Sequence, residues 1–288
     1  MMDSSYVLLN MTDIIQLHGH SGCNISIHRS ANDVFVRKSS NTVNYNDRLI
    51  KQRIKQAAYQ NSSLFTPRVL RDGCQGDKYY FDMEYIKGET LAHLIASAPA
   101  NLIDYYIRKI VDSFNFDNKV NIAAQSIFLE KIKSTEEKII EHEYYNHKTI
   151  KDAIRCCMNT DFSGVPTSEC HGDLTLENII ISNDTIYLID FLDSFYDSWM
   201  IDVAKLMQDI VLGWSFRLSE NNSNIRPRLI AAQASLSKIL NEQGIDDRQL
   251  QLIHNILKLN LLRILPYTSD TPTLKFIIRS LNFLQDRK

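Results

Sequence analysis

The sequence lacks the features that mark several large classes of protein. Its five cysteines are odd in number and include no CxxC pair, so they indicate neither a disulfide framework nor a zinc-binding motif. The formal net charge is only −2, so an interaction with nucleic acid would need a local basic patch. No apolar run reaches the roughly 18 residues that a membrane-spanning helix needs. We therefore expect reduced thiols, no nucleic acid partner and no membrane span.

The N-terminal region also lacks the charge pattern of a secretory signal. Residues 1–17 contain Asp3 and Asp13 but no Lys or Arg, whereas a signal peptide begins with a positively charged segment. The 288 residues are 44% hydrophobic and 23% charged, which is typical of a globular chain with one large domain or two lobes. We expect a cytoplasmic protein with a full hydrophobic core.

The chain changes character after Gly88. Before it, short apolar runs at 6–9, 14–17, 24–28, 34–38, 69–70 and 79–85 predict strands. A helix is expected over 47–61, with Leu49, Ile50, Ile54 and Ala57 along one side. After it, helical periodicity covers 90–98, 102–114, 122–145, 149–158, 199–218, 227–241, 247–264 and 273–284, interrupted by a strand pair near 179–190. The pattern predicts an α+β protein with a small strand-rich lobe (1–86) and a larger, mainly helical lobe (87–288).

One hairpin can be placed in register from its turn. Asn183 and Asp184 both tolerate positive φ, so they can form a tight two-residue turn. Paired residue numbers then add up to 367, which places Asn178 opposite Ile189 and brings Asp190 to the same open end, about 5 Å away across the strands. Asp173 lies five residues before Asn178 on the preceding loop. Oxygen ligands of this kind suit Mg²⁺, which binds through few protein groups plus phosphates.

At this point the sequence resembles a known family. The pattern HGDxxxxN from His171 to Asn178, followed by IDF at 189–191, is similar to the aminoglycoside phosphotransferase and choline kinase-like group. These are small-molecule kinases with a bilobal protein-kinase-like fold, a small antiparallel sheet in the first lobe and helices in the second. The resemblance implies that Asp173 is the catalytic base and that Asn178 and Asp190 hold Mg²⁺. It also implies ATP or GTP as co-substrate and a small-molecule hydroxyl acceptor against the C-terminal helices.

Asp202 resembles the buried carboxylate that fixes the catalytic loop, and His171 is most simply a structural support.

The same resemblance assigns a nucleotide site to the first lobe. Gly19, Ser21 and Gly22 are similar to a short phosphate-binding loop, because glycine lets the backbone approach phosphate. Lys38 resembles the strand lysine that contacts the α- and β-phosphates, with Arg37 pointing to the other face of the strand. The resemblance also implies an adenine-binding hinge, formed by the backbone of the residues Met83, Glu84 and Ile86.

The sequence departs from the protein-kinase pattern in three places. Asp190-Phe191-Leu192 has no glycine and His171-Gly172-Asp173 has no arginine, which favours a small-molecule kinase over one controlled by activation-loop phosphorylation. The helix after Lys38 offers glutamines, at 52 and 56, but no glutamate to pair with the lysine. The only acid of this helix is Asp47, at its start. Either a glutamine orients Lys38, or an acid from elsewhere does, or the phosphate-binding residue is a neighbour of Lys38.

Two alternatives stand beside the small-molecule kinase. The missing glutamate motivates a nucleotide-binding regulatory module with little or no catalysis, against which the intact set of Asp173, Asn178 and Asp190 argues. The third hypothesis is a kinase with a protein acceptor. Four aromatic residues could contact an acceptor, although a place in the helical core is the simpler interpretation; they are Tyr196, Trp199, Trp214 and Phe216.

Overall fold

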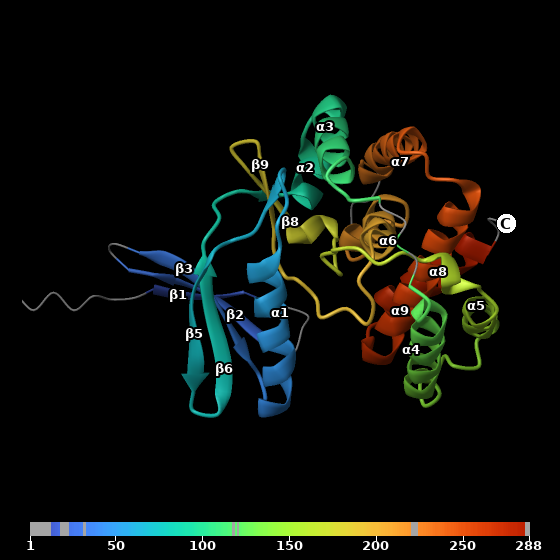
Figure 1. Cartoon of the computed structure of the whole chain (residues 1–288), viewed down its shortest axis with the longest axis horizontal. Helices are drawn as coiled ribbons and strands as arrows, with labels where there is room; N and C mark the ends of the chain where they lie inside the picture. The colour runs from blue at the N-terminus through green and yellow to red at the C-terminus, as the bar shows by residue number, and fades with distance from the viewer. Residues whose placement is uncertain are drawn as a thin grey trace, which may run out of the picture. The chain divides into compact units, whose positions relative to one another are not determined.

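The computed structural model describes residues 13–17, 23–30, 33–116, 119, 121–219 and 224–285 (Figure 1). The chain divides into two compact units. One comprises Met1–Tyr59 and Thr66–Lys87, and the other Gln60–Phe65 and Gly88–Lys288. Residues 60–65 therefore belong to the second unit, although the sequence pattern assigns them to the first. The apolar run at 6–9 and most of the expected turn at 31–33 lie outside the described residues.

The first unit is an antiparallel sheet of five strands in the order β1-β2-β3-β6-β5, with one helix, α1 (Asn46–Ala58), packed against it (Figure 1). The strands are β1 (Asp13–Leu17), β2 (Cys23–Arg29), β3 (Val34–Ser40), β5 (Val69–Gln75) and β6 (Lys78–Glu84). Leu49 of α1 packs on Tyr79, Phe81 and Met83 of β6 to form the core of this unit. A short 3₁₀ helix, η1 (Val43–Tyr45), leads into α1.

The buried side of α1 differs from the sequence expectation. Leu49 is buried, but Ile54 is 51% exposed and Ala57 is also exposed. Gln52 and Gln56 are buried in their place, three and seven residues after Leu49. The Gln56 amide donates to the main-chain oxygen of Pro67 at 2.9 Å. Because this hydrogen bond compensates the buried amide, hydrophobicity alone did not identify the inward face of the helix.

The second unit combines a small sheet with eight α-helices in the described residues. Its strands β4 (Leu64–Phe65), β7 (Glu89–Thr90), β8 (Ile179–Ser182) and β9 (Thr185–Leu188) lie in the order β4-β9-β8-β7. The helices are α2 (Leu91–Ser97), α3 (Ala100–Val111), α4 (Ala124–Ile139), α5 (Lys148–Met158), α6 (Trp199–Ile210), α7 (Ile225–Glu242), α8 (Asp247–Ile264) and α9 (Thr271–Gln285). The predicted α+β class, with an antiparallel sheet in the N-terminal region and helices in the C-terminal region, is confirmed.

Helix ends follow local chemistry. α8 has the bounds expected from the sequence, because Asp246 and Gln249 form a reciprocal capping box at its start. α6 ends at Ile210, earlier than expected, and Gly213 follows with a φ of +81° that a helix cannot continue. α4 ends at Ile139, also earlier than expected, where the ring of His142 bonds to the main-chain oxygen of Thr268.

α6 is the central helix of the second unit. Every one of its residues is buried, and it packs against α7 and α8. Burial on all sides is unusual for a helix that carries ionisable residues, so each of these must find a partner inside the protein. Within the described residues, no helix has the length and apolar character that crossing a membrane requires.

Candidate active site

The hairpin that carries two of the candidate residues has the expected register. Asn183 and Asp184 adopt φ values of +47° and +59°, and Ile179 pairs with Leu188. The register extends by one more pair, because the Ile189 N–H donates to the main-chain oxygen of Asn178 at 3.0 Å. Asn178 and Asp190 therefore stand at the open end of the same hairpin.

A carboxylate of α6 anchors the start of the loop before the hairpin. Asp202 of α6 is 3% exposed and accepts hydrogen bonds from the His171 N–H at 2.6 Å and the Gly172 N–H at 2.8 Å. Gly172 has a φ of +89°, in the region that favours glycine, and a Cβ there would collide with Ser194 Oγ. The loop thus enters the site with a backbone conformation that requires glycine at position 172.

The His171 ring lies beneath this loop. Its Nδ1 accepts a hydrogen bond from the Asp173 N–H at 3.2 Å, so the proton is on Nε2, which donates to the main-chain oxygen of Ile189 at 2.8 Å. Both ring nitrogens are therefore hydrogen-bonded to main-chain atoms, and the ring joins the loop to the hairpin.

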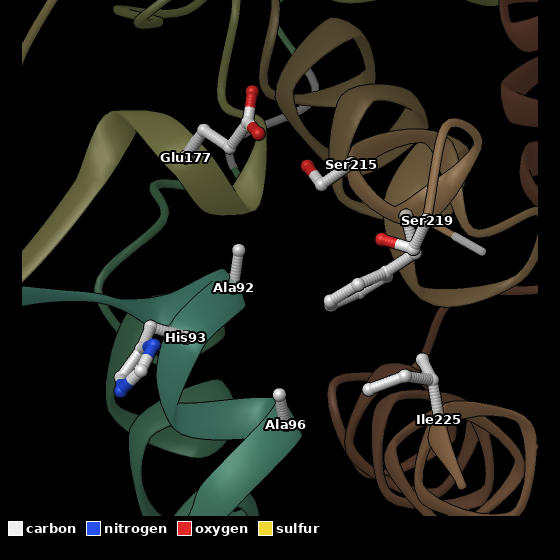
Figure 2. Close-up of a pocket in the computed structure, with 8 residues that line it drawn as sticks. Ala92, His93, Ala96, Glu177, Ser215, Ser219 and Ile225 are labelled. Atoms are coloured by element: carbon white, nitrogen blue, oxygen red, sulfur yellow. The ribbon is translucent and has the colours of Figure 1, made fainter. Parts of the chain in front are cut away.

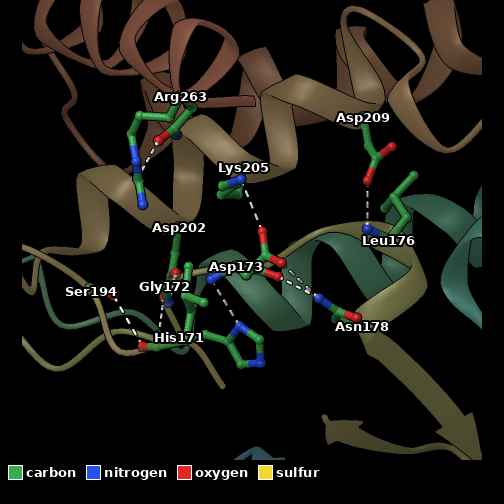
Figure 3. Close-up of polar contacts among 12 residues, drawn as sticks. His171, Gly172, Asp173, Leu176, Asn178, Ser194, Asp202, Lys205, Asp209 and Arg263 are labelled. Carbon is green, nitrogen blue, oxygen red and sulfur yellow. Dashed lines mark hydrogen bonds and ion pairs between the residues drawn. The ribbon is translucent and has the colours of Figure 1, made fainter. Parts of the chain in front are cut away.

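Asp173 lies at the centre of the polar cluster shown in Figure 3. Its side chain is 30% exposed, and its Oδ1 lies 2.9 Å from Nζ of Lys205, whose own side chain is 9% exposed. Burial by itself would raise the pKa of Asp173, but the charge and hydrogen bond of Lys205 hold the pKa below its ordinary value. The carboxylate is therefore ionised at neutral pH.

The side chain of Asn178 is turned toward Asp173. Its Nδ2 donates to the main-chain oxygen of Asp173 at 2.9 Å and lies 3.4 Å from Asp173 Oδ2. Because the amide nitrogen is used in this way, Oδ1 is the atom of Asn178 that could bind a cation. Asp190 has a φ of +63°, a backbone conformation that is costly for a residue with a side chain and is frequent at functional sites.

This donor set fits Mg²⁺. An amide oxygen and a carboxylate are hard oxygen ligands, and Mg²⁺ usually takes few ligands from protein and the rest from water and phosphate. No group of three His, Cys, Asp or Glu side chains in the part of the chain that the structure describes is arranged to hold a metal ion. An ion would therefore depend on Asn178 and Asp190 together with non-protein ligands.

Sequence reasoning missed two residues of α6 that contact the loop. Lys205 pairs with Asp173, and Asp209 accepts the Leu176 N–H at 2.7 Å. Figure 3 shows the side chains of Asp202, Lys205 and Asp209 directed from one helix to successive parts of the loop. Their spacing of three and four residues, along a helix whose other residues are apolar except Gln208, was the available signal.

Asp209 is fully buried and bridges two segments. One carboxylate oxygen accepts the Leu176 N–H, and the other accepts the Ser215 N–H at 2.6 Å. Burial raises the pKa of Asp209 to about 6, although both hydrogen bonds act in the opposite direction.

In the first unit, Lys38 and Arg37 point to opposite faces of β3. Lys38 is 1% exposed and lies on the face of β3 that α1 covers. In the sheet it stands opposite Phe81 of β6. Arg37 forms a two-bond ion pair with the buried Asp82, at 2.7 and 2.9 Å, and Arg71 bonds the same carboxylate. Arg37 therefore has a structural role, which is to pair with the buried Asp82 carboxylate.

The other candidate nucleotide-binding residues are only partly described. Met83 and Glu84 end β6, and Ile86 follows in the segment that leads to the second unit. Gly19, Ser21 and Gly22 lie outside the described residues.

A cavity of about 690 Å³ lies in the second unit beside the end of the loop 171–178 (Figure 2). Its wall includes Glu177, which directly precedes Asn178, and residues of α2, α7 and η4 (Trp214–Phe216), namely Ala92, His93, Ala96, Ser215, Phe216 and Ile225. Ser215 also belongs to this wall, and its N–H donates to the buried Asp209 carboxylate. Of the four aromatic candidates, Tyr196 and Trp199 are core residues, and Phe216 lines this cavity.

Comparison with known proteins agrees with this geometry. Residues 124–236 match the model of the phosphotransferase enzyme family (APH), and this segment contains the whole HGDxxxxN motif and α6. No curated protein matches the chain. The match confirms, for this segment of the chain, the resemblance named from the motifs.

Solved structures share the fold over most of the chain. A thermostable mutant of aminoglycoside phosphotransferase APH(4)-Ia, in ternary complex with AMP-PNP and hygromycin B, has a TM-score of 0.61 and 12% identity, and the match covers 96% of this chain and 91% of that one. Choline kinase from Cryptosporidium parvum Iowa II has a TM-score of 0.56 and 12% identity, with 96% and 88% covered. At such identities the likeness shows a common fold.

Proposed function

We propose that this protein is a cytoplasmic kinase that transfers the γ-phosphoryl group of ATP or GTP to a hydroxyl of a small molecule. The proposal starts from the match of residues 124–236 to the phosphotransferase enzyme family. One observation carries this proposal. The Asp173 carboxylate and the Asn178 amide are held against each other, on a loop whose backbone N–H groups are bound by the buried Asp202. Such an arrangement serves phosphoryl transfer, which needs mainly positioning and neutralisation of charge.

Asp173 is the proposed catalytic base. Its carboxylate is ionised and partly exposed, so it can accept the proton of the acceptor hydroxyl. The acceptor oxygen then forms the new bond to the γ-phosphorus, while the bond to the leaving oxygen of ADP or GDP breaks. The proton stays on Asp173 until it is released to water.

Asn178 and Asp190 are the proposed ligands of Mg²⁺. When bound, Mg²⁺ would neutralise charge on the nucleotide phosphates. The contribution of the chain is to fix the two oxygen ligands at the end of one hairpin, through the bond between Ile189 and Asn178. The Asp173 main-chain oxygen, bonded by Asn178 Nδ2, orients the amide oxygen.

The first 86 residues are proposed to bind the nucleotide. Lys38 would contact the α- and β-phosphates, with backbone donors from Gly19, Ser21 and Gly22. The backbone of residues 83, 84 and 86 would hydrogen-bond the purine. The burial of Lys38 on the α1 side of the sheet supports a specific role for its ammonium group, because a lysine is rarely buried without one.

The acceptor is proposed to bind in the helical region, residues 87–288. The cavity beside Glu177 has a size suited to a small molecule, and it combines an apolar wall with a carboxylate and a hydroxyl. The APH(4)-Ia complex holds hygromycin B, but the net charge of −2 gives no reason to prefer a polycation over a neutral sugar, amino alcohol or cell-envelope precursor.

The test is direct detection of product. The protein is incubated with ATP, GTP, Mg²⁺ and pooled sugars, amino sugars and amino alcohols, and products are identified by mass spectrometry. Asp173→Ala should abolish a phosphorylated product that the wild type and the exposed control Asp247→Ala both form. Binding of nucleotide that ignores Mg²⁺ and gives no product would contradict the proposal.

One feature favours a second candidate, a nucleotide-binding regulatory module. The inward face of α1 carries Gln52 and Gln56 where a catalytic kinase of this fold would be expected to carry a glutamate. Such a module would bind nucleotide equally well in the wild type and in Asp173→Ala, without turnover in either. Labelled phosphate found in proteins but not in metabolites would instead indicate a protein acceptor.

A further inference from the structure

Three ionisable residues form a stripe on α6 that follows the catalytic loop. Asp202, Lys205 and Asp209 are separated by three and four residues, so they project within about 60° of one another on an ideal helix. Asp202 binds the start of the loop at 171–172, Lys205 binds Asp173, and Asp209 binds the backbone at Leu176. The helix therefore contacts the loop in order, from its beginning to its end.

Lys205 contacts the side chain of the loop residue Asp173. Its Nζ lies 2.9 Å from Asp173 Oδ1, with only 9% of the lysine side chain exposed. Asp202 and Asp209 accept hydrogen bonds from backbone N–H groups of the loop, and so determine the path of the loop. Lys205 instead determines the direction of the carboxylate itself.

We propose that Lys205 is a positioning residue for phosphoryl transfer, which fixes the Asp173 carboxylate and offsets its negative charge. This inference rests on the proposed function. It assigns different roles to the two oxygens of Asp173, with Oδ1 held by Lys205 and Oδ2, on the side of Asn178, left to receive the acceptor proton.

Two physical arguments support this role. A carboxylate held by a charge-assisted hydrogen bond keeps one orientation, and orientation of the base is a large part of catalysis in phosphoryl transfer. An uncompensated carboxylate would also repel the anionic phosphoryl group, and Lys205 places the opposite charge directly against it. The position of Lys205 on a rigid, fully buried helix makes both effects independent of substrate binding.

The experiment compares three variants by steady-state kinetics, with the acceptor found in the pooled assay. Lys205→Met removes the charge and keeps the length, and Lys205→Arg keeps the charge. Lys258→Met is the matched control, because Lys258 is also a buried lysine of the second unit, bonded to Asn255 and Cys156 rather than to the loop. Thermal melting confirms that each variant is folded.

We expect Lys205→Met to lower kcat about 100-fold with the KM for nucleotide within twofold of wild type, the size of effect typical of lost base assistance. Lys205→Arg should recover at least a tenth of the wild-type kcat, and Lys258→Met should keep nearly all of it. The inference is wrong if Lys205→Met retains half of the wild-type kcat, if only KM changes, or if the Lys258→Met loss is equal.

A second measurement separates this inference from the proposed function. In ¹⁵N-lysine-labelled protein, the ammonium group of Lys205 should give a slowly exchanging NMR signal that disappears in Asp173→Asn. Absence of that signal in the wild type overturns the ion pair whatever the activity. If the signal is present but no acceptor in the pool is phosphorylated, then the proposed function fails, and the catalytic role of Lys205 fails with it.

Discussion

The Asp202 carboxylate accepts a hydrogen bond from the Gly172 N–H at 2.8 Å, and its second oxygen accepts the neighbouring His171 N–H at 2.6 Å. Asp202→Asn replaces one of these acceptors with a donor that faces a backbone N–H. We expect the free energy of unfolding to fall by about 2–3 kcal/mol, because a buried donor loses a charged partner. Phosphotransfer should fall more than tenfold, as the loop no longer fixes Asp173.

Urea unfolding and steady-state kinetics measure these two effects. The exposed Asp247 provides a control, because Asp247→Asn changes the same chemical group at the surface. An Asp202→Asn protein with wild-type stability and wild-type activity would show that the loop does not depend on this carboxylate.

A pair of glycines separates the effect of backbone shape from the effect of crowding. Gly172 and Gly76 both have positive φ, +89° and +64°, but a Cβ at 172 would meet Ser194 Oγ whereas a Cβ at 76 has nothing within 4 Å. Gly76→Ala should cost about 1 kcal/mol, from backbone conformation alone. Gly172→Ala should cost at least 2 kcal/mol and should also reduce activity.

The added cost at 172 can be assigned by a double variant. Gly172→Ala combined with Ser194→Ala removes the Oγ collision and should recover part of the loss in a thermal melt. Equal destabilisation by Gly172→Ala and Gly76→Ala would refute the role given to crowding.

Two consecutive residues of β3 should have opposite phenotypes. Lys38→Met should raise the KM for ATP about tenfold, since a charge-assisted hydrogen bond to phosphate contributes roughly 1.5–3 kcal/mol. Arg37→Met should leave that KM unchanged, but lower the free energy of unfolding by about 2 kcal/mol, because the buried Asp82 would keep only Arg71. If the nucleotide KM rises in Arg37→Met instead, then the two faces of β3 have been assigned the wrong way round.

The hairpin at 179–188 shows what the sequence could determine. The turn residues Asn183 and Asp184 require positive φ, and the position of a two-residue turn fixes every pair along both strands. The opposition of Asn178 and Ile189 follows from this arithmetic without any knowledge of the rest of the fold. Local chemistry was therefore sufficient for this part of the site.

The burial of two helical residues, Gln52 and Lys205, depends on tertiary contacts. Gln52 and Lys205 are polar side chains in helices, and a polar residue by itself predicts an exposed position. Gln52 is 3% exposed and Lys205 is 7% exposed. The partner of Lys205 is Asp173, 32 positions earlier, on a different element. Only the spacing of Asp202, Lys205 and Asp209 along a mostly apolar helix indicated that these three residues share one inward face.

The cavity beside Glu177 can be tested by filling it. Ala96→Trp adds a large ring to the cavity wall, so the KM for the acceptor should rise at least tenfold while the KM for nucleotide stays within twofold. Ala57→Trp, at an exposed position of α1, controls for a surface tryptophan. An unchanged acceptor KM in Ala96→Trp would place the acceptor elsewhere in the helical unit.

The buried Asp209 predicts an unusual dependence of stability on pH. Its pKa is about 6 in the folded protein against an ordinary value of 3.8, so between these pH values the folded state binds more protons than the unfolded state. Stability from this group is therefore greatest below about pH 4, and it is lost as the pH rises to about 6. A shift of about two units corresponds to roughly 3 kcal/mol.

Asp209→Asn removes this titration while keeping the size of the side chain. The difference in unfolding free energy between variant and wild type should therefore move by about 3 kcal/mol in favour of the variant from pH 4 to pH 7. Urea unfolding at the two pH values measures it. Asp247→Asn, at an exposed carboxylate, should show no comparable movement. A difference that stays constant between the two pH values would mean that the Leu176 and Ser215 N–H groups stabilise the charged form fully, in spite of burial.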